Sequence, residues 1–218
     1  MTAINRDALL QSDTVMPFLR DGAWRDSHSP YYRFAHHEAD EYSKAIDLLS
    51  RGEELLAAEQ SNVGPEVAYE GGIFDDEDLL DLHDAAYRHS IGCHLFACMS
   101  LEGFLNTYGV RRLGERFYQQ NLERMGISEK FAVIGMCCSQ WVVAPDSEVC
   151  KDIRQLFDDR NRLVHPKTRE IRWDRLEDAV YVHPSQLPVG DTMLRLERCI
   201  DFLVRADNSI VRNFYFRR

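Results

Sequence analysis

The chain has 218 residues, a formal net charge of −10, and hydrophobic side chains at 44% of its positions. A chain of this length can form one domain whose core needs no disulfide or metal to hold it together. The acidic balance excludes a protein that coats nucleic acid over its whole surface, because phosphate binding depends on clustered lysine and arginine. Any contact with RNA must therefore be local.

The sequence has no segment that predicts secretion or membrane insertion. The first twenty residues include Arg6, Asp7 and Asp13 and lack an apolar core, and no later stretch approaches the roughly 18 apolar residues that a membrane span requires. The six cysteines include no CxxC pair, so we expect reduced and mostly buried thiols. We therefore expect a cytoplasmic protein without a membrane partner.

The first half of the chain predicts an arm followed by two helices. Residues 1–35 mix charged, proline and aromatic side chains without sustained periodicity, which predicts an irregular N-terminal arm. From His36, apolar residues recur at helical spacing as far as a glycine-containing loop at 62–72. Acidic residues at 75–78 can cap a second, long helix, which we expect to end at Gly109 or shortly after.

The second half predicts further helices and one stretch of undecided structure. Residues 131–143 are a short apolar run typical of a buried helix. Asp146 or Ser147 can cap the next helix, which must end near His165 because a proline follows. Residues 166–190 fit either a short hairpin or an irregular insert, and a last helix follows Asp191.

These elements predict the fold class and its boundaries. Four or five packed helices without a convincing set of strands indicate an all-α bundle. We assign residues 36–218 to this single helical domain and residues 1–35 to the arm.

The end of the helix before residue 166 carries the most informative residues, Arg160, Asn161 and His165. Side chains four residues apart share a helix face, so Asn161 and His165 can meet, and the long Arg160 side chain can reach the imidazole. Histidine at a helix C-terminus suits a general acid or base, and arginine supplies forked donors to a phosphate. The trio therefore predicts a site for cleaving a phosphodiester.

A local excess of positive charge surrounds these residues. Between 160 and 175 there are six basic residues and two acidic ones, which runs against the balance of the whole chain. We expect the side chains beyond the trio to contact RNA: Arg162, Lys167, Arg169 and Arg172. A solvated charged loop is the simpler alternative.

The motif resembles the signature of the HEPN superfamily of small α-helical domains, which is Arg, a polar residue that is often Asn, three variable residues and His. Residues 160–165 match it at every defined position. Leu101-Glu102-Gly103-Phe104-Leu105-Asn106 is also similar to a stretch on an earlier helix of many members. The resemblance covers about 79–108, 147–166 and the last helix, and elsewhere rests on helical character. It implies a HEPN-like helical bundle.

Catalytic HEPN members are metal-independent RNases of toxin–antitoxin, abortive-infection and CRISPR-linked defence. The resemblance implies that the ribose 2′-hydroxyl attacks the adjacent phosphate, which leaves a cyclic phosphate and a 5′-hydroxyl, without a metal or cofactor. Because the motif has one histidine, a two-fold homodimer would supply the second His165 and Arg160. Lys167 stands where some HEPN toxins have a tyrosine that a partner nucleotidyltransferase modifies. Inhibition by modification of that tyrosine is therefore not expected, and the possible partner is a protein antitoxin or a larger defence complex.

Several alternatives remain open. The chain could be a non-catalytic HEPN-like interaction module or regulatory subunit in which Arg160 and His165 only brace the helix end, and Glu102 and Asn106 could line a cleft or brace the core. The doublet at 83–84, His-Asp, occurs in metal-dependent phosphohydrolases. Two His–Cys pairs spaced four apart, at 89/93 and 94/98, lack a further ligand pair for zinc.

Overall fold

A computed structural model describes residues 15–16, 24–25, 28–62, 76–139, 141–164, 188–210 and 216. The described part is helical apart from one pair of two-residue antiparallel strands, so the all-α class is confirmed. Its elements in chain order are β1 (Val15–Met16), β2 (Trp24–Arg25), α2 (His28–Asn62), α3 (Asp76–Leu113), α4 (Glu115–Asn121), α5 (Ile127–Ile134), the π-helical turn η1 (Gly135–Ser139), α6 (Glu148–Val164) and α7 (Val189–Ala206).

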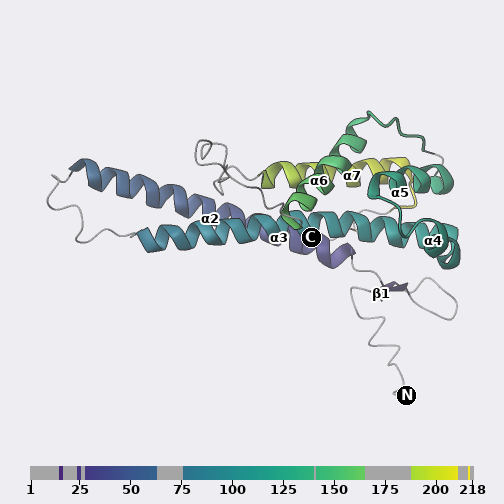
Figure 1. Cartoon of the computed structure of the whole chain (residues 1–218), viewed down its shortest axis with the longest axis horizontal. Coiled ribbons are helices and arrows are strands. Elements are labelled where there is room, and N and C mark those ends of the chain that lie inside the picture. Colours follow the sequence, from purple (N-terminus) through teal and green to yellow (C-terminus); the bar gives the residue numbers. More distant parts are fainter. Residues whose placement is uncertain are drawn as a thin grey trace, which may run out of the picture.

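Helices α2 and α3 form a long antiparallel hairpin (Figure 1). Residues of α2 pack closely on two glycines of α3: an added Cβ would lie 2.8 Å from the Glu38 carboxylate at Gly92 and 3.3 Å from the His28 Cβ at Gly103. The Nδ1 of His89 also donates a hydrogen bond of 2.7 Å to the Glu38 carboxylate. These contacts set the register of the two helices.

Helices α5, α6 and α7 pack along the second half of α3 and enclose the main core. Leu101, Phe104 and Leu105 of α3 have no exposed surface, and they belong to one cluster of buried side chains that also includes residues of α2, α4, α5, α6 and α7. The apolar side of α6 enters this core at Val149, Ile153 and Leu156, and that of α7 at Leu196, Cys199, Ile200 and Leu203. The core therefore lies at one end of the long hairpin.

A smaller buried cluster marks where α7 begins. Val189, the first residue of α7, packs against Tyr42 and Ala45 of α2 and against Ala86 and Cys93 of α3. Helix α7 thus starts over the middle of the hairpin and runs along it toward the main core (Figure 1).

The boundaries differ from the sequence-based expectations in three places. Helix α2 begins at His28 rather than His36, because Tyr32 and Ala35 are buried in the core and Pro30 is tolerated in a first turn. Helix α7 begins at Val189, whose side chain is buried, rather than after Asp191, whereas α3 ends at Leu113, shortly after Gly109 as expected. The apolar run expected as one helix at 131–143 is the end of α5 followed by η1.

The insert expected at 166–190 falls outside the described residues as far as 187. Within the part of the chain that the structure covers, none of the helices has the length and apolar character needed to cross a bilayer.

Candidate functional site

The residues of the predicted site that the structure describes lie in the last turns of α6. At the other end of the helix, the Cys150 amide donates to Ser147 Oγ at 3.4 Å, so Ser147 is the residue that caps α6. Three buried apolar side chains then attach the first half of the helix to the core. Because the helix continues to Val164, Arg160, Asn161 and Arg162 come at its outer end.

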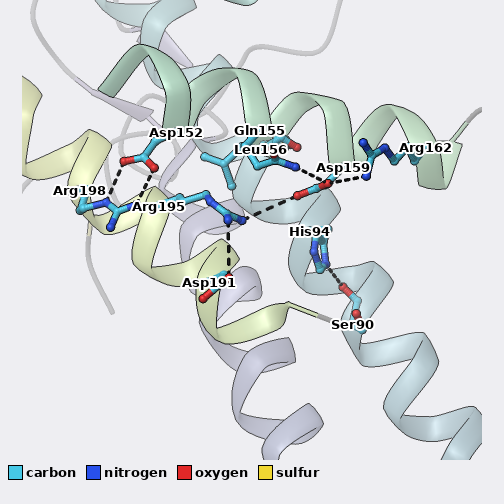
Figure 2. A network of polar contacts seen from close by, with 11 residues as sticks. Ser90, His94, Asp152, Gln155, Leu156, Asp159, Arg162, Asp191, Arg195 and Arg198 are labelled. Carbon is cyan, nitrogen blue, oxygen red and sulfur yellow. Dashed lines mark hydrogen bonds and ion pairs between the residues drawn. The ribbon is translucent and has the colours of Figure 1, made fainter. Parts of the chain in front are cut away.

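Two carboxylates of α6 join this helix to α7 (Figure 2). Asp152 is buried and accepts two hydrogen bonds from the Arg198 guanidinium, at 2.8 and 2.6 Å. Asp159, seven residues later, lies 3.8 Å from Arg195. The bidentate pair is the stronger of the two, since fork-to-fork geometry aligns both hydrogen bonds.

Asp159 sits at the centre of the polar contacts beside the motif (Figure 2). Its carboxylate accepts a hydrogen bond of 2.8 Å from Gln155 and lies 3.6 Å from the Arg162 guanidinium. Arg195 bridges it to Asp191 at the start of α7, 3.6 Å away. The Asp159 side chain is only 13% exposed, whereas that of Arg162 is 77% exposed. The contacts therefore leave the Arg162 guanidinium open to solvent.

Arg160 and Asn161 are joined to each other. An Nη atom of Arg160 donates a hydrogen bond of 2.9 Å to the Asn161 side-chain oxygen. Arg160 is half-buried and Asn161 is exposed. Burial raises the pKa of the Cys98 thiol to about 12, and the positive charge of Arg160 opposes this rise. Arg160 is therefore near enough to α3 for its charge to act on Cys98.

His165 lies outside the described residues, as do Lys167, Arg169 and Arg172. The structure thus places Arg160, Asn161 and Arg162 of the predicted site on one helix turn. The expected pairing of Asn161 with His165 stays a prediction.

A turn of α3 with two polar side chains lies below this end of α6 (Figure 2). The Cys98 thiol donates to the backbone oxygen of Leu156 at 3.2 Å. Buried His94 donates from Nδ1 to the Ser90 oxygen at 2.7 Å, one turn earlier. Both side chains of this His–Cys pair therefore have hydrogen-bond partners within the protein, and no three His, Cys, Asp or Glu side chains of the described residues are grouped to hold a metal ion.

Glu102 and Asn106, which could line a cleft or brace the core, belong to a second polar cluster whose other members, Tyr118 and Lys130, the sequence did not indicate. The Asn106 side-chain oxygen accepts hydrogen bonds from Tyr118 and, at 2.8 Å, from Lys130. Lys130 is only 1% exposed, and burial lowers the pKa of its ammonium group although Glu102, 3.8 Å away, opposes this. Asn106 thus braces the core, and Glu102 lies at the exposed edge of the cluster.

The sequence contained little to predict this cluster. Lys130 directly precedes the apolar run at 131–143, and a lysine at the edge of such a run is usually exposed. Its burial depends on α4, which brings Tyr118 next to α3.

Comparison with protein-family models, with curated proteins and with solved structures found no match to this chain.

Proposed function

We propose that the end of α6 is the active site of a metal-independent endoribonuclease of the HEPN type. The observation that carries the proposal is the joined Arg160–Asn161 pair at the outer end of α6, beside the exposed Arg162 guanidinium. The residue three positions after Arg162 is His165, the acid–base group of the motif. These residue types match what phosphodiester cleavage needs: cationic donors for the phosphate and a group that transfers protons.

Each side chain has a role in this proposal. Arg160 donates to the non-bridging oxygens of the scissile phosphate, whose negative charge increases as the 2′-hydroxyl attacks. Asn161 orients the Arg160 guanidinium through the hydrogen bond between them. Arg162 contacts a neighbouring phosphate, together with Lys167, Arg169 and Arg172. His165 takes the proton from the 2′-hydroxyl, and His165 of a second copy in a homodimer protonates the 5′-oxygen that leaves.

The proposed setting is cytoplasmic, with RNA as the substrate. A toxin–antitoxin or anti-phage defence system is the biological role that the motif implies. In such a system, an antitoxin or defence-complex protein restrains the nuclease.

The test is cleavage of labelled RNA by the full chain in the presence of EDTA. We expect the wild type to leave 2′,3′-cyclic phosphate ends, and Arg160→Ala and His165→Ala to lower the rate by about 10²-fold or more. Arg154→Ala is the matched control, because Arg154 is an exposed arginine of the same helix whose guanidinium donates to the Pro145 oxygen. A folded, dimeric wild type that is inert on tRNA, mRNA and structured RNA would contradict the proposal.

A non-catalytic interaction module is the second candidate, and one observation favours it. Arg160 donates a hydrogen bond to Asn161, and Asp159 forms ion pairs with Arg162 and Arg195. These contacts can stabilise the end of α6 without any role in catalysis. This candidate predicts that Arg160→Ala lowers the free energy of unfolding while the wild type has no RNase activity. The nuclease proposal predicts a loss of activity with little change in stability.

A further inference from the structure

Helices α2 and α3 extend well beyond the start of α7 (Figure 1). Val189 packs over Ala45 and Ala86, and the hairpin continues from there to residue 62 of α2 and residue 76 of α3. Among the described elements, only α2 and α3 pack against each other in this distal part. Among the elements that the structure describes, a third layer covers the hairpin at one end and not at the other.

One face of α3 runs through both parts. Leu80 and Cys98 are 18 residues apart, which is about five turns of an α-helix, so they point in the same direction. Cys98 is 2% exposed and lies under α6, to which it donates a hydrogen bond at Leu156. Leu80 is 60% exposed, and Tyr87, on the same face, is 46% exposed. The surface on which α6 packs therefore continues, uncovered by any described element, toward the distal end of the hairpin.

This distal face is strongly acidic. Asp84 lies between Leu80 and Tyr87 on the same side of the helix, because it is four residues from one and three from the other. Asp81, one turn before Asp84, is exposed as well. Exposed Arg88 lies one turn after Asp84 on the same side and donates a hydrogen bond of 3.3 Å to the Asp84 backbone oxygen, but residues 76–90 contain five acidic side chains against this one arginine. A partner for this face must bring apolar side chains together with positive charge.

We propose that the distal face, defined by Leu80, Asp81, Asp84 and Tyr87, binds a basic amphipathic α-helix of a partner protein. Apolar side chains of that helix pack between Leu80 and Tyr87, and its lysines or arginines pair with Asp81 and Asp84. A helix fits because α6 already packs in this way on the same face of α3 at Cys98. Nucleic acid does not fit, since the carboxylates repel phosphate. The proposal does not depend on nuclease activity.

The test uses the full chain and a defined probe. The probe is a fluorescein-labelled peptide of about 18 residues with leucines on one helical face and lysines on the other, and binding is followed by fluorescence anisotropy. We expect Leu80→Ser/Tyr87→Ser to weaken binding by about tenfold or more. We expect Asp81→Asn/Asp84→Asn to weaken binding and to reduce its dependence on salt.

The matched control is Leu48→Ser/Leu55→Ser. These leucines of α2 are also seven residues apart and similarly exposed, at 44% and 41%. We expect this variant to bind the peptide as the wild type does, and we expect a peptide with glutamates in place of lysines not to bind.

Four outcomes would overturn the proposal. They are no binding by the wild type, an equal loss in the α2 control, equal binding of the glutamate peptide, and a large fall in melting temperature of Leu80→Ser/Tyr87→Ser without peptide. The last would mean that other residues of this chain cover the face. Dissociation of a homodimer by the same variant would assign the face to a second copy instead.

Discussion

The two ends of helix α3 differ in what surrounds them. Over residues 97–113, α5, α6 and α7 enclose the helix, and side chains such as Leu105 have no exposed surface. Over residues 76–88, α2 is its main described neighbour, and Leu80 and Tyr87 are exposed. Apolar side chains on the same face of α3 thus differ in burial, because only at the core end does another described helix lie against that face. The core end holds the fold together, and the distal end is free to bind a partner.

Of the variants that test this difference, Leu105→Ala should change the free energy of unfolding most. Removing a fully buried side chain leaves a cavity, and we expect the free energy of unfolding to fall by about 2–5 kcal/mol. Leu80→Ala, the matched change at the distal end, should alter it by about 0.5 kcal/mol or less. Urea denaturation of both variants measures the two values. Similar losses would mean that the distal end is as well packed as the core end.

Asp207, just after α7, gives a pH-dependent test at the core end. Burial raises the pKa of this carboxyl, but hydrogen bonds from Tyr108 and Ser209 and the charge of Arg112 outweigh it and lower the pKa to about 2, from an ordinary 3.8. Because the folded-state pKa is depressed, the stabilisation is present above pH 3.8 and is lost as the pH falls toward 2.

We therefore expect Asp207→Asn to lower the free energy of unfolding by about 1–2 kcal/mol at pH 7. Between pH 5 and 2, the variant should lose less stability than the wild type. Denaturant titrations across this pH range measure the difference, and parallel pH curves for the two proteins would show that Asp207 does not contribute.

Helix α6 also has one end in the core and one end near the surface, and we expect substitutions there to change stability less than Leu105→Ala does. Asp152, near the core, has the bidentate pair with Arg198, whereas Asp159 has longer ion pairs with Arg162 and Arg195. We expect Asp159→Asn to cost less than about 1 kcal/mol of stability and Asp152→Asn to cost more.

Hydrogen exchange distinguishes these two variants further. Asp159→Asn should speed amide exchange only over the last turn of α6, whereas Asp152→Asn should affect α6 and α7 together. Faster exchange throughout the chain in Asp159→Asn would contradict the local role assigned to Asp159.

Local sequence patterns predicted the helices where caps and apolar spacing agree. Helix α6 has both, since Ser147 caps it and Val149, Ile153 and Leu156 lie on one face. The first turns of α2 were missed because Tyr32 is buried by residues distant in the sequence, including Phe216. Within the run at 131–143 every face is apolar, so periodicity could not separate α5 from η1.

In the candidate site, too, some features could be predicted from the sequence and others depended on how the helices pack. The motif residues Arg160 and Asn161 could be identified from their types and spacing alone. The contact of Asp159 with Arg195 could not, because it depends on how α7 is rotated against α6. The Lys130–Asn106 hydrogen bond likewise required the packing of α5 on α3.

Residue order was thus sufficient for the helical class, for the start of α6 near Asp146 or Ser147 and for singling out Arg160 and Asn161, since these depend on neighbours within a few positions along the chain. Only packing decided that Cys98 is covered while Leu80, on the same face, is exposed. The physical reason is that an amphipathic pattern states which side of a helix can be buried, whereas burial itself requires another element to lie against that side.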